Sequence, residues 1–180
     1  MIKKFEEYIN EGVRDQMTPK SEEDIRNSVS VSSPYQKIKI GVENDIPWAV
    51  QQGFDEAKKG KKILSYGSLE ELVFDSVHRG LEEVLDILLS NGVEMVHKQD
   101  VLISAVGSGN INILKLLVEK YKYDLDLLDF SMNELYKFID YGDRVDCIKY
   151  IVENSKKIKN NLQDRADDLV EEARLIKQYL

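Results

Sequence analysis

The sequence has one cysteine, two histidines, fewer positively than negatively charged residues and no long apolar run. Its 180 residues contain one cysteine, Cys147, so no intramolecular disulfide can form, and a reducing compartment is compatible with the chain. The longest apolar run, residues 113–118, is interrupted by Lys115 and is much shorter than the ~20 residues of a membrane-spanning helix. The first residues lack the apolar stretch of a secretory signal. We therefore expect a cytoplasmic protein without a membrane partner.

The net charge of −8 argues against a nucleic-acid partner, because sequence-independent binding of DNA or RNA needs a positively charged surface. Two short basic runs, residues 58–62 and 156–159, are each bounded by acidic stretches. That setting indicates solvated protein surface, with a local anionic contact as the alternative.

The residue types that carry catalysis and metal binding are also scarce. His78 and His97 are the only histidines, and neither has a cysteine or a histidine at ligand spacing. Cys147 lies on the apolar face of an expected helix, where a buried structural thiol is typical. The segment from Gly107 to Gly109 is too short for a phosphate-binding loop and lacks its lysine. The sequence therefore predicts no enzyme, no metal site and no cofactor.

What the chain does contain is a repeated pattern of two apolar segments separated by a glycine. The copies begin 29 and 33 residues apart, and the clearest one is residues 102–119. In each copy the glycine follows a residue of the first segment by four positions: Ser76 and Gly80, Ala105 and Gly109, Phe138 and Gly142. One such unit is too small to bury its own apolar face, so the pattern predicts an all-α stack of helix–turn–helix units.

Residues 69–154 resemble the ankyrin repeat. In that family an inner helix with the signature Thr-Pro-Leu-His-x-Ala is followed by a glycine turn and by an outer helix that ends in Leu-Leu-x-x-Gly. The matching residues are Leu102, Ala105 and Gly109, and Leu88, Leu89 and Gly92 of the preceding unit. The Thr-Pro and His positions hold Asp100, Val101 and Ile103 instead. The resemblance implies an all-α, ankyrin-like helical-repeat solenoid.

The flanks of these repeats carry three further predictions. Residues 34–68 fit a degenerate repeat acting as an N-terminal cap, in which Gly53 precedes a weak second helix and Ser68 caps the helix that follows. Residues 155–180 form a helix without glycine or proline. Its apolar seam is Leu162, Ala166, Leu169, Ala173, Ile176 and Leu180, at spacings of 4 and 3. We interpret it as a capping helix packed over the last repeat, with self-association or a partner-dependent helix as alternatives.

Residues 1–33 are expected to be an N-terminal extension. Ser21 and Asp24 form a capping-box pattern that predicts a helix over residues 22–28, and the serine-rich run before Pro34 reads as a linker or a weak strand. Residues 1–12 resemble the capsid-targeting leader of internal head proteins of large tailed phages, and residues 13–25 resemble the start of ankyrin-type proteins of large DNA viruses and phages. The leader resemblance implies proteolytic processing between Glu11 and Gly12. The alternative is an N-terminal docking helix that ends at Gly12.

Two functions remain open. The ankyrin resemblance implies a non-enzymatic protein–protein interaction module whose loops, around residues 94–100 and 122–133, project toward an unidentified protein partner. The candidate contact residues are Tyr121, Tyr123, Asp124, Asp126, Phe130 and Met132. Alternatively, the aromatic residues fill gaps between neighbouring repeats. The second function is a phage internal head or virion-associated protein that is delivered by a cleavable leader.

Overall fold

The structure is a computed structural model that describes residues 21–61, 64, 66–128 and 144–178. Every regular element in these ranges is helical, which confirms the all-α prediction. The elements are α2 (Glu22–Val31), α3 (Pro34–Glu43), α4 (Pro47–Lys59), α5 (Tyr66–Arg79), α6 (Glu82–Ser90), α7 (Lys98–Gly107), α8 (Ile111–Lys115), the π-helical turn η1 (Leu116–Lys120), the 3₁₀ turn η2 (Leu125–Leu127), α10 (Val145–Asn154) and α11 (Lys156–Gln178). The predicted processing site, Glu11 and Gly12, lies outside the described residues, as do Phe130, Met132, Phe138 and Gly142.

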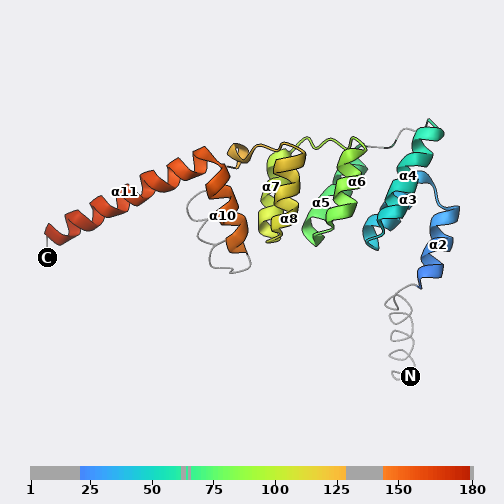
Figure 1. The fold of residues 1–180 in the computed structure, drawn as a ribbon, viewed down its shortest axis with the longest axis horizontal. Coiled ribbons are helices and arrows are strands. Elements are labelled where there is room, and N and C mark those ends of the chain that lie inside the picture. Colours follow the sequence, from blue (N-terminus) through green and yellow to red (C-terminus); the bar gives the residue numbers. More distant parts are fainter. Residues whose placement is uncertain (1–20, 62–63, 65, 129–143, 179–180) are drawn as a thin grey trace, which may run out of the picture.

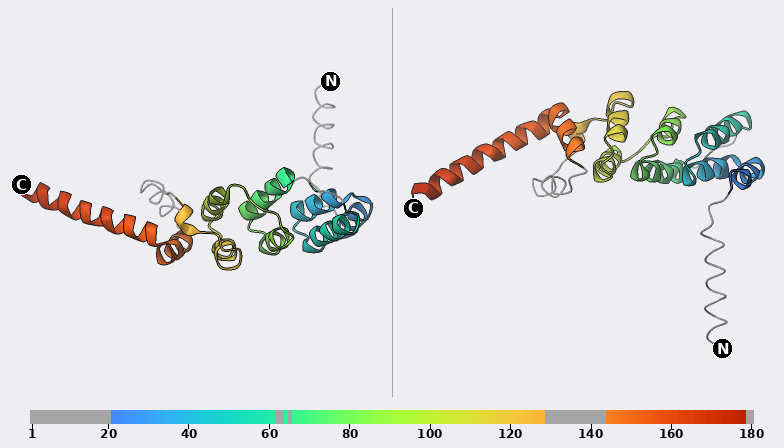
Figure 2. Two further views of the ribbon diagram at one scale, coloured as in Figure 1. Left: turned by 90° about the horizontal axis from the view of Figure 1, so that it is seen from above. Right: turned by 60° about the horizontal axis from the view of Figure 1, so that its bottom comes forward.

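The central helices form three pairs, α3 with α4, α5 with α6, and α7 with α8, which follow one another along the long axis of the molecule (Figure 1). The first helices of the pairs form one row, since α5 contacts α3 on one side and α7 on the other. The second helices form another row, in which α6 contacts α4 and α10 contacts α8 (Figure 2). A single apolar core runs through the stack, from Ile38 in the first pair to Ile158 at the start of α11.

The turn inside each pair is made by a residue with positive φ, a backbone conformation that glycine adopts without strain. Gly80 has φ 72° and Gly109 has φ 71°, so the two glycines that align in the sequence also hold equivalent positions in the structure. In the first pair this place is taken by Asp45, with φ 54°. Ser76 and Ala105, four residues before the glycines, are both fully buried. The aligned small residues are therefore part of the buried interior beside each turn.

The first pair corrects the role predicted for Gly53. This glycine is not in a turn but in the middle of α4, eight residues after the turn residue Asp45. Leu88 and Leu117 hold the equivalent positions of the next two units. A Cβ atom on Gly53 would lie 2.6 Å from Ile38 Cγ1 and 2.6 Å from the carbonyl oxygen of Pro34. The residue is therefore glycine because α3 crosses α4 at this point, and the predicted break between two short helices does not exist.

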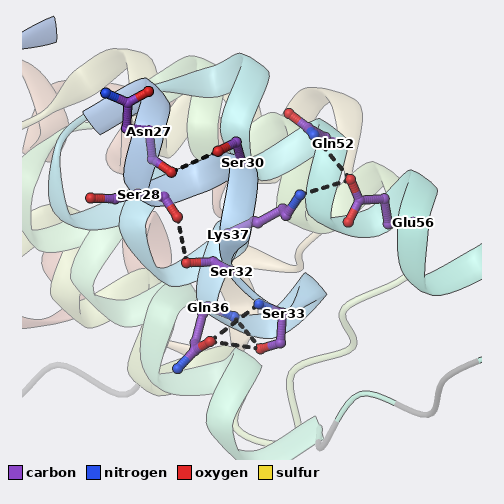
Figure 3. A network of polar contacts seen from close by, with 9 residues as sticks. All are labelled: Asn27, Ser28, Ser30, Ser32, Ser33, Gln36, Lys37, Gln52 and Glu56. Carbon is purple, nitrogen blue, oxygen red and sulfur yellow. Dashed lines mark hydrogen bonds and ion pairs between the residues drawn. The ribbon is translucent and has the colours of Figure 1, made fainter. Parts of the chain in front are cut away.

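The start of the chain also differs from the prediction. The capping box between Ser21 and Asp24 is present, but α2 continues to Val31 and absorbs most of the serine-rich run (Figure 3). Ser33 is the N-cap of α3, its hydroxyl accepting a hydrogen bond from the backbone N–H of Gln36. Ser68 lies inside α5, which starts at Tyr66, and is therefore not its cap. Serine hydroxyls can satisfy the free backbone groups at helix ends. The serine-rich run therefore forms the end of α2 and the N-cap of α3, and it is not a strand.

One buried charge stands out in the first pair. The Lys37 side chain is only 3% exposed and lies at the position that apolar Leu72 and Val101 hold in the next two units. Its ammonium group donates to Glu56 Oε1 at 2.8 Å, and the Gln52 amide donates to the same oxygen at 2.9 Å (Figure 3). The hydrogen bond from Lys37 is the main cause that lowers the pKa of Glu56. The Glu56 carboxyl group therefore remains ionised at neutral pH.

The C-terminal helix α11 is present, but it does not lie over the last pair as predicted. Ile158 is 3% exposed against the core and Leu162 is half-buried, whereas the residues from Ala166 onward that the structure describes are exposed. Figures 1 and 2 show the helix leading away from the stack. The start of the helix closes the array, because Ile158 belongs to the core and Leu162 packs against it.

Candidate partner-binding surface

The segments that connect successive helix pairs lie on one side of the stack. Residues 93–97 link α6 to α7, and residues 121–128 lead from η1 toward α10, both along the upper edge in Figure 1. Between them is a recess of about 370 Å³. Its walls are Leu89, Gly92, Val93, Glu94, Met95, Lys98, Tyr121 and Tyr123. The recess therefore lies in the region where the sequence predicts loops that face a partner.

Tyr121 ties the third unit to the second. Its hydroxyl lies 2.6 Å from the Asp86 carboxylate and 2.8 Å from the Asp86 carbonyl oxygen, and donates to this residue. The neighbouring Lys120 ammonium lies 2.5 and 2.8 Å from the two carboxylate oxygens of Asp86. Burial works to raise the pKa of Asp86, but the hydrogen bonds from Lys120 and Tyr121 outweigh it and lower the pKa. Burial and the Asp86 carboxylate both raise the pKa of the Tyr121 phenol, so the phenol remains a donor.

A widened helical turn positions the side chains of Lys120 and Tyr121 beside Asp86. The positive-φ residue that ends the second unit is Gly92, twelve positions after Gly80, whereas Lys122 follows Gly109 by thirteen. The outer helix of the third unit therefore has one additional residue, and the π-helical turn Leu116–Lys120 absorbs it. The Tyr121 N–H then donates to the carbonyl oxygen of Leu116, five residues earlier. No glycine spacing in the sequence reveals this insertion, because the third unit ends at Lys122 instead of at a glycine.

Tyr123 is a wall of the recess rather than a free contact residue. It is 6% exposed, its N–H donates to the Leu117 carbonyl oxygen at 3.0 Å, and burial raises its pKa. The Lys98 ammonium lies 5.2 Å from the centre of its ring, within the range of a cation–π contact. Both tyrosines therefore pack between neighbouring units, as in the alternative that the sequence left open.

The two aspartates of this segment have different roles. Asp124 is exposed and its carboxylate accepts a hydrogen bond from the Asp126 N–H at 2.9 Å, which caps the turn η2. Asp126 accepts from the Ser155 hydroxyl at 2.6 Å and from the Lys157 N–H at 3.4 Å. Ser155 itself is buried at the junction of α10 and α11. Asp126 therefore fastens the start of α11 to the stack, while Asp124 remains available to solvent or to a partner.

Two apolar side chains that no sequence pattern marks are exposed on these connections. Val96 is 77% exposed on the first connection, and its N–H donates to the carboxylate of Glu70 at 2.9 Å. Leu127 is 45% exposed on the second connection, within η2, and its N–H donates to the Asp124 carbonyl oxygen at 3.2 Å. Both backbones are held by hydrogen bonds while the side chains face water. Both side chains lie on the connecting segments that also supply walls of the recess, Met95 on the first and Tyr123 on the second.

Two other recesses are less suited to a partner. One of about 280 Å³ lies between α6 and α8–η1 and is lined by Glu82, Asn112, Lys115, Leu116, Glu119 and Lys120. Another, of about 330 Å³, is lined by these described residues of α10: Val145, Ile148, Lys149, Val152 and Glu153. The first is mostly charged, and none of the connecting segments that the structure describes contributes to either.

The described ranges contain no cluster of three or more histidine, cysteine, aspartate or glutamate side chains arranged to hold a metal ion. None of the helices in this part of the chain combines the length and hydropathy that a membrane span requires. Cys147, predicted to be a buried thiol, is fully buried in α10. The chain matches no family model, no curated protein and no solved structure.

Proposed function

We propose that this protein is a non-enzymatic, ankyrin-like interaction module that binds an extended segment of another protein along its connecting loops. The observation that carries the proposal is the pair of exposed apolar side chains, Val96 and Leu127, on hydrogen-bonded connections that also supply walls of the 370 Å³ recess. Stacked helix pairs provide the rigid support that such loops need.

The chemistry of the recess indicates what such a segment would offer. Its floor is apolar, with Leu89, Val93 and Met95 at most 8% exposed. Lys98 and Glu94 at its rim are exposed and of opposite charge. An apolar anchor side chain would fill the recess, and polar groups on either side of it would meet the charged rim. Methionine and aromatic residues are suitable walls for an anchor of variable shape.

The test uses a displayed library of random peptides, selected on the full chain, and then measures the affinity of one selected peptide for variants. Val96→Asp and Leu127→Asp are each expected to weaken binding by about tenfold or more, because a buried carboxylate without a partner opposes docking. Val31→Asp is the matched control, since Val31 is 86% exposed on α2 and distant in sequence from the recess. Full binding by both loop variants, or a library without any binder, would exclude this surface.

Charge reversal at the two predicted contact aspartates, Asp124 and Asp126, is expected to have different effects. Asp124→Lys is a clean test of partner binding, since its only described role is to cap a three-residue turn. Asp126→Lys is expected to loosen the junction with α11, because Ser155 would lose its acceptor. Only Asp124 should therefore change partner affinity without a change in thermal stability.

A further inference from the structure

Beyond its contacts with the stack, α11 exposes an apolar seam to solvent. The helix has 23 residues, and the described apolar side chains beyond Leu162 do not reach the core. Leu169 is 42% exposed and Val170 is 70% exposed. An isolated amphipathic helix is marginally stable in water, because most helical stability comes from packing of the apolar face. A helix of this length with an uncovered seam therefore gains stability from a partner along that seam.

The charged face of α11 is already engaged in contacts within the helix. The Arg174 guanidinium binds both carboxylate oxygens of Glu171 at 2.8 Å, and the Gln163 amide donates to Asp167 at 3.0 Å. These residues lie off the line defined by Leu162, Ala166, Leu169 and Ala173. The seam is thus the side of the helix that remains for a second helix to cover.

We propose that α11 pairs with α11 of a second copy of this chain, as an antiparallel two-helix coiled coil in which Ala166 packs against Leu169 of that copy. The same register sets Leu162 against Ala173. Each alanine then faces a leucine, so that small and large side chains interdigitate at a close helix separation. A parallel, in-register pair would instead set alanine against alanine twice and leave space in the seam.

Charge complementarity supports this register. Arg165 and Glu172 flank the seam, and the antiparallel arrangement places Arg165 opposite Glu172 of the second copy, twice by symmetry. On the other flank of the seam, Val170 lies opposite Gln163 of that copy. Within one helix Arg165 Nη1 already lies 3.4 Å from Glu172 Oε1 and 3.9 Å from Asp168 Oδ2, and these side chains are 41–70% exposed. Such exposed contacts are weak, so Arg165 can exchange them for a partner across the interface.

The shape of the molecule favours the antiparallel orientation as well. At about 1.5 Å per residue, α11 spans roughly 35 Å, and it leads away from the stack of helix pairs (Figure 2). Antiparallel pairing places the two stacks at opposite ends of the coiled coil. Parallel pairing would bring both stacks to the same end, where they would compete for space.

The first experiment is sedimentation equilibrium of the full chain over a wide range of concentrations. Wild type is expected to approach twice the chain mass of 20.8 kDa, and Leu169→Lys is expected to remain at the monomer mass. Asn160→Lys introduces the same charge at an exposed position off the seam and should dimerise as wild type does. A monomeric wild type, or a dimeric Leu169→Lys, overturns the proposal.

A charge exchange tests the orientation. Arg165→Glu and Glu172→Arg should each weaken the dimer, and the double exchange should restore it, because the antiparallel register pairs these two positions with each other. In a parallel pair Glu172 would approach Lys177, so the double exchange would not restore the dimer. Failure of the rescue overturns the antiparallel register.

Cross-linking provides a second test of the orientation. An equimolar mixture of Gln163→Cys and Val170→Cys chains should form a mixed covalent dimer with a short bismaleimide cross-linker, because these two positions face each other in the antiparallel register. Either variant alone should cross-link less, and wild type, with only the buried Cys147, should not cross-link. A parallel pair brings each position beside itself, so more cross-linking by the single variants than by the mixture overturns the antiparallel register.

Discussion

Gly41 lies where α3 and α4 meet, and replacement by alanine is expected to destabilise the protein. A Cβ atom on Gly41 would lie 2.5 Å from Val50 Cγ2, 2.8 Å from the Val50 nitrogen and 2.9 Å from the Ile46 carbonyl oxygen. The last two are backbone atoms in the turn and first residues of α4, and the Gly41 carbonyl accepts a hydrogen bond from the Ile46 N–H at 2.7 Å. A rotamer change cannot relieve those two contacts, so the helices must separate.

The magnitude follows from two opposing effects. Overpacking of a core typically costs about 1–3 kcal/mol, whereas glycine to alanine inside a helix gains about 0.5–1 kcal/mol. We therefore expect Gly41→Ala to lower the free energy of unfolding by about 1–2 kcal/mol. Gly107→Ala is the matched control, because Gly107 is also helical and no heavy atom lies within 4 Å of the position that its Cβ atom would occupy. That variant should keep or raise the stability of wild type.

The assay is urea unfolding followed by far-UV circular dichroism, with wild type and the two variants compared at constant temperature. The free energies should rank Gly107→Ala at or above wild type and Gly41→Ala below it, with similar dependence on urea. If Gly41→Ala matched or exceeded Gly107→Ala, the close crossing of α3 and α4 would be wrong. The interpretation of Gly53, which makes a similar close approach, would then be wrong as well.

Three other perturbations probe the core, the buried charge and the ties between units. Ala105→Leu should lower the unfolding free energy by about 1–3 kcal/mol in a urea titration, because this fully buried site has no space for a larger side chain, and unchanged stability would contradict the repeat register. Glu56→Gln should lower the midpoint of thermal unfolding more than Lys37→Met does. Glu56→Gln leaves the buried Lys37 ammonium without its carboxylate, whereas Lys37→Met removes the buried charge. The reverse order of the two midpoints would refute the ion pair. The pKa of Asp86 is lower in the folded protein than its ordinary value of 3.8. The ionised Asp86 therefore stabilises the folded state fully above pH 3.8, and this contribution is lost as the pH falls through the lower pKa of the folded state. Wild type should therefore exceed Asp86→Asn in stability at neutral pH, with a gap that narrows in acid; a gap independent of pH would contradict this tie.

The sequence was most informative where a repeated spacing identifies the role of a residue. The spacing of apolar segments alone aligns Gly80 with Gly109, and both adopt the positive φ that the turn requires. The burial of Cys147 also followed from its position on the apolar face of a predicted helix. Periodicity and turn chemistry are local properties, so one sequence suffices to detect them.

Prediction failed where the same residue type has several uses. Gly53 resembles a turn residue in the sequence, yet it is a contact point between helices, which depends on Ile38 and Pro34 from another element. Lys37 is charged and would be assigned to the surface, but Glu56 from α4 allows it to lie in the core. The roles of Gly53 and Lys37 both depend on residues that are distant along the chain.

The candidate surface was also predictable only in part. The sequence indicated the region, since the repeat pattern marks the connecting loops and their tyrosines, but it could not distinguish binding residues from packing residues. Tyr121 and Tyr123 are occupied by contacts with Asp86 and Lys98, while Val96, which no pattern marks, is exposed. The aromatic content of a loop does not reveal which way its side chains face.

The sequence by itself determined that the chain is helical, that its units contain two helices each, and where the turns of the second and third units fall. These properties follow from apolar spacing and from the backbone freedom of glycine. Only the tertiary structure decided how the first pair packs, which loop side chains are exposed, and that α11 leaves the stack instead of covering it. The physical reason is that each of these depends on the free energy of contacts between distant segments, which a local pattern does not contain.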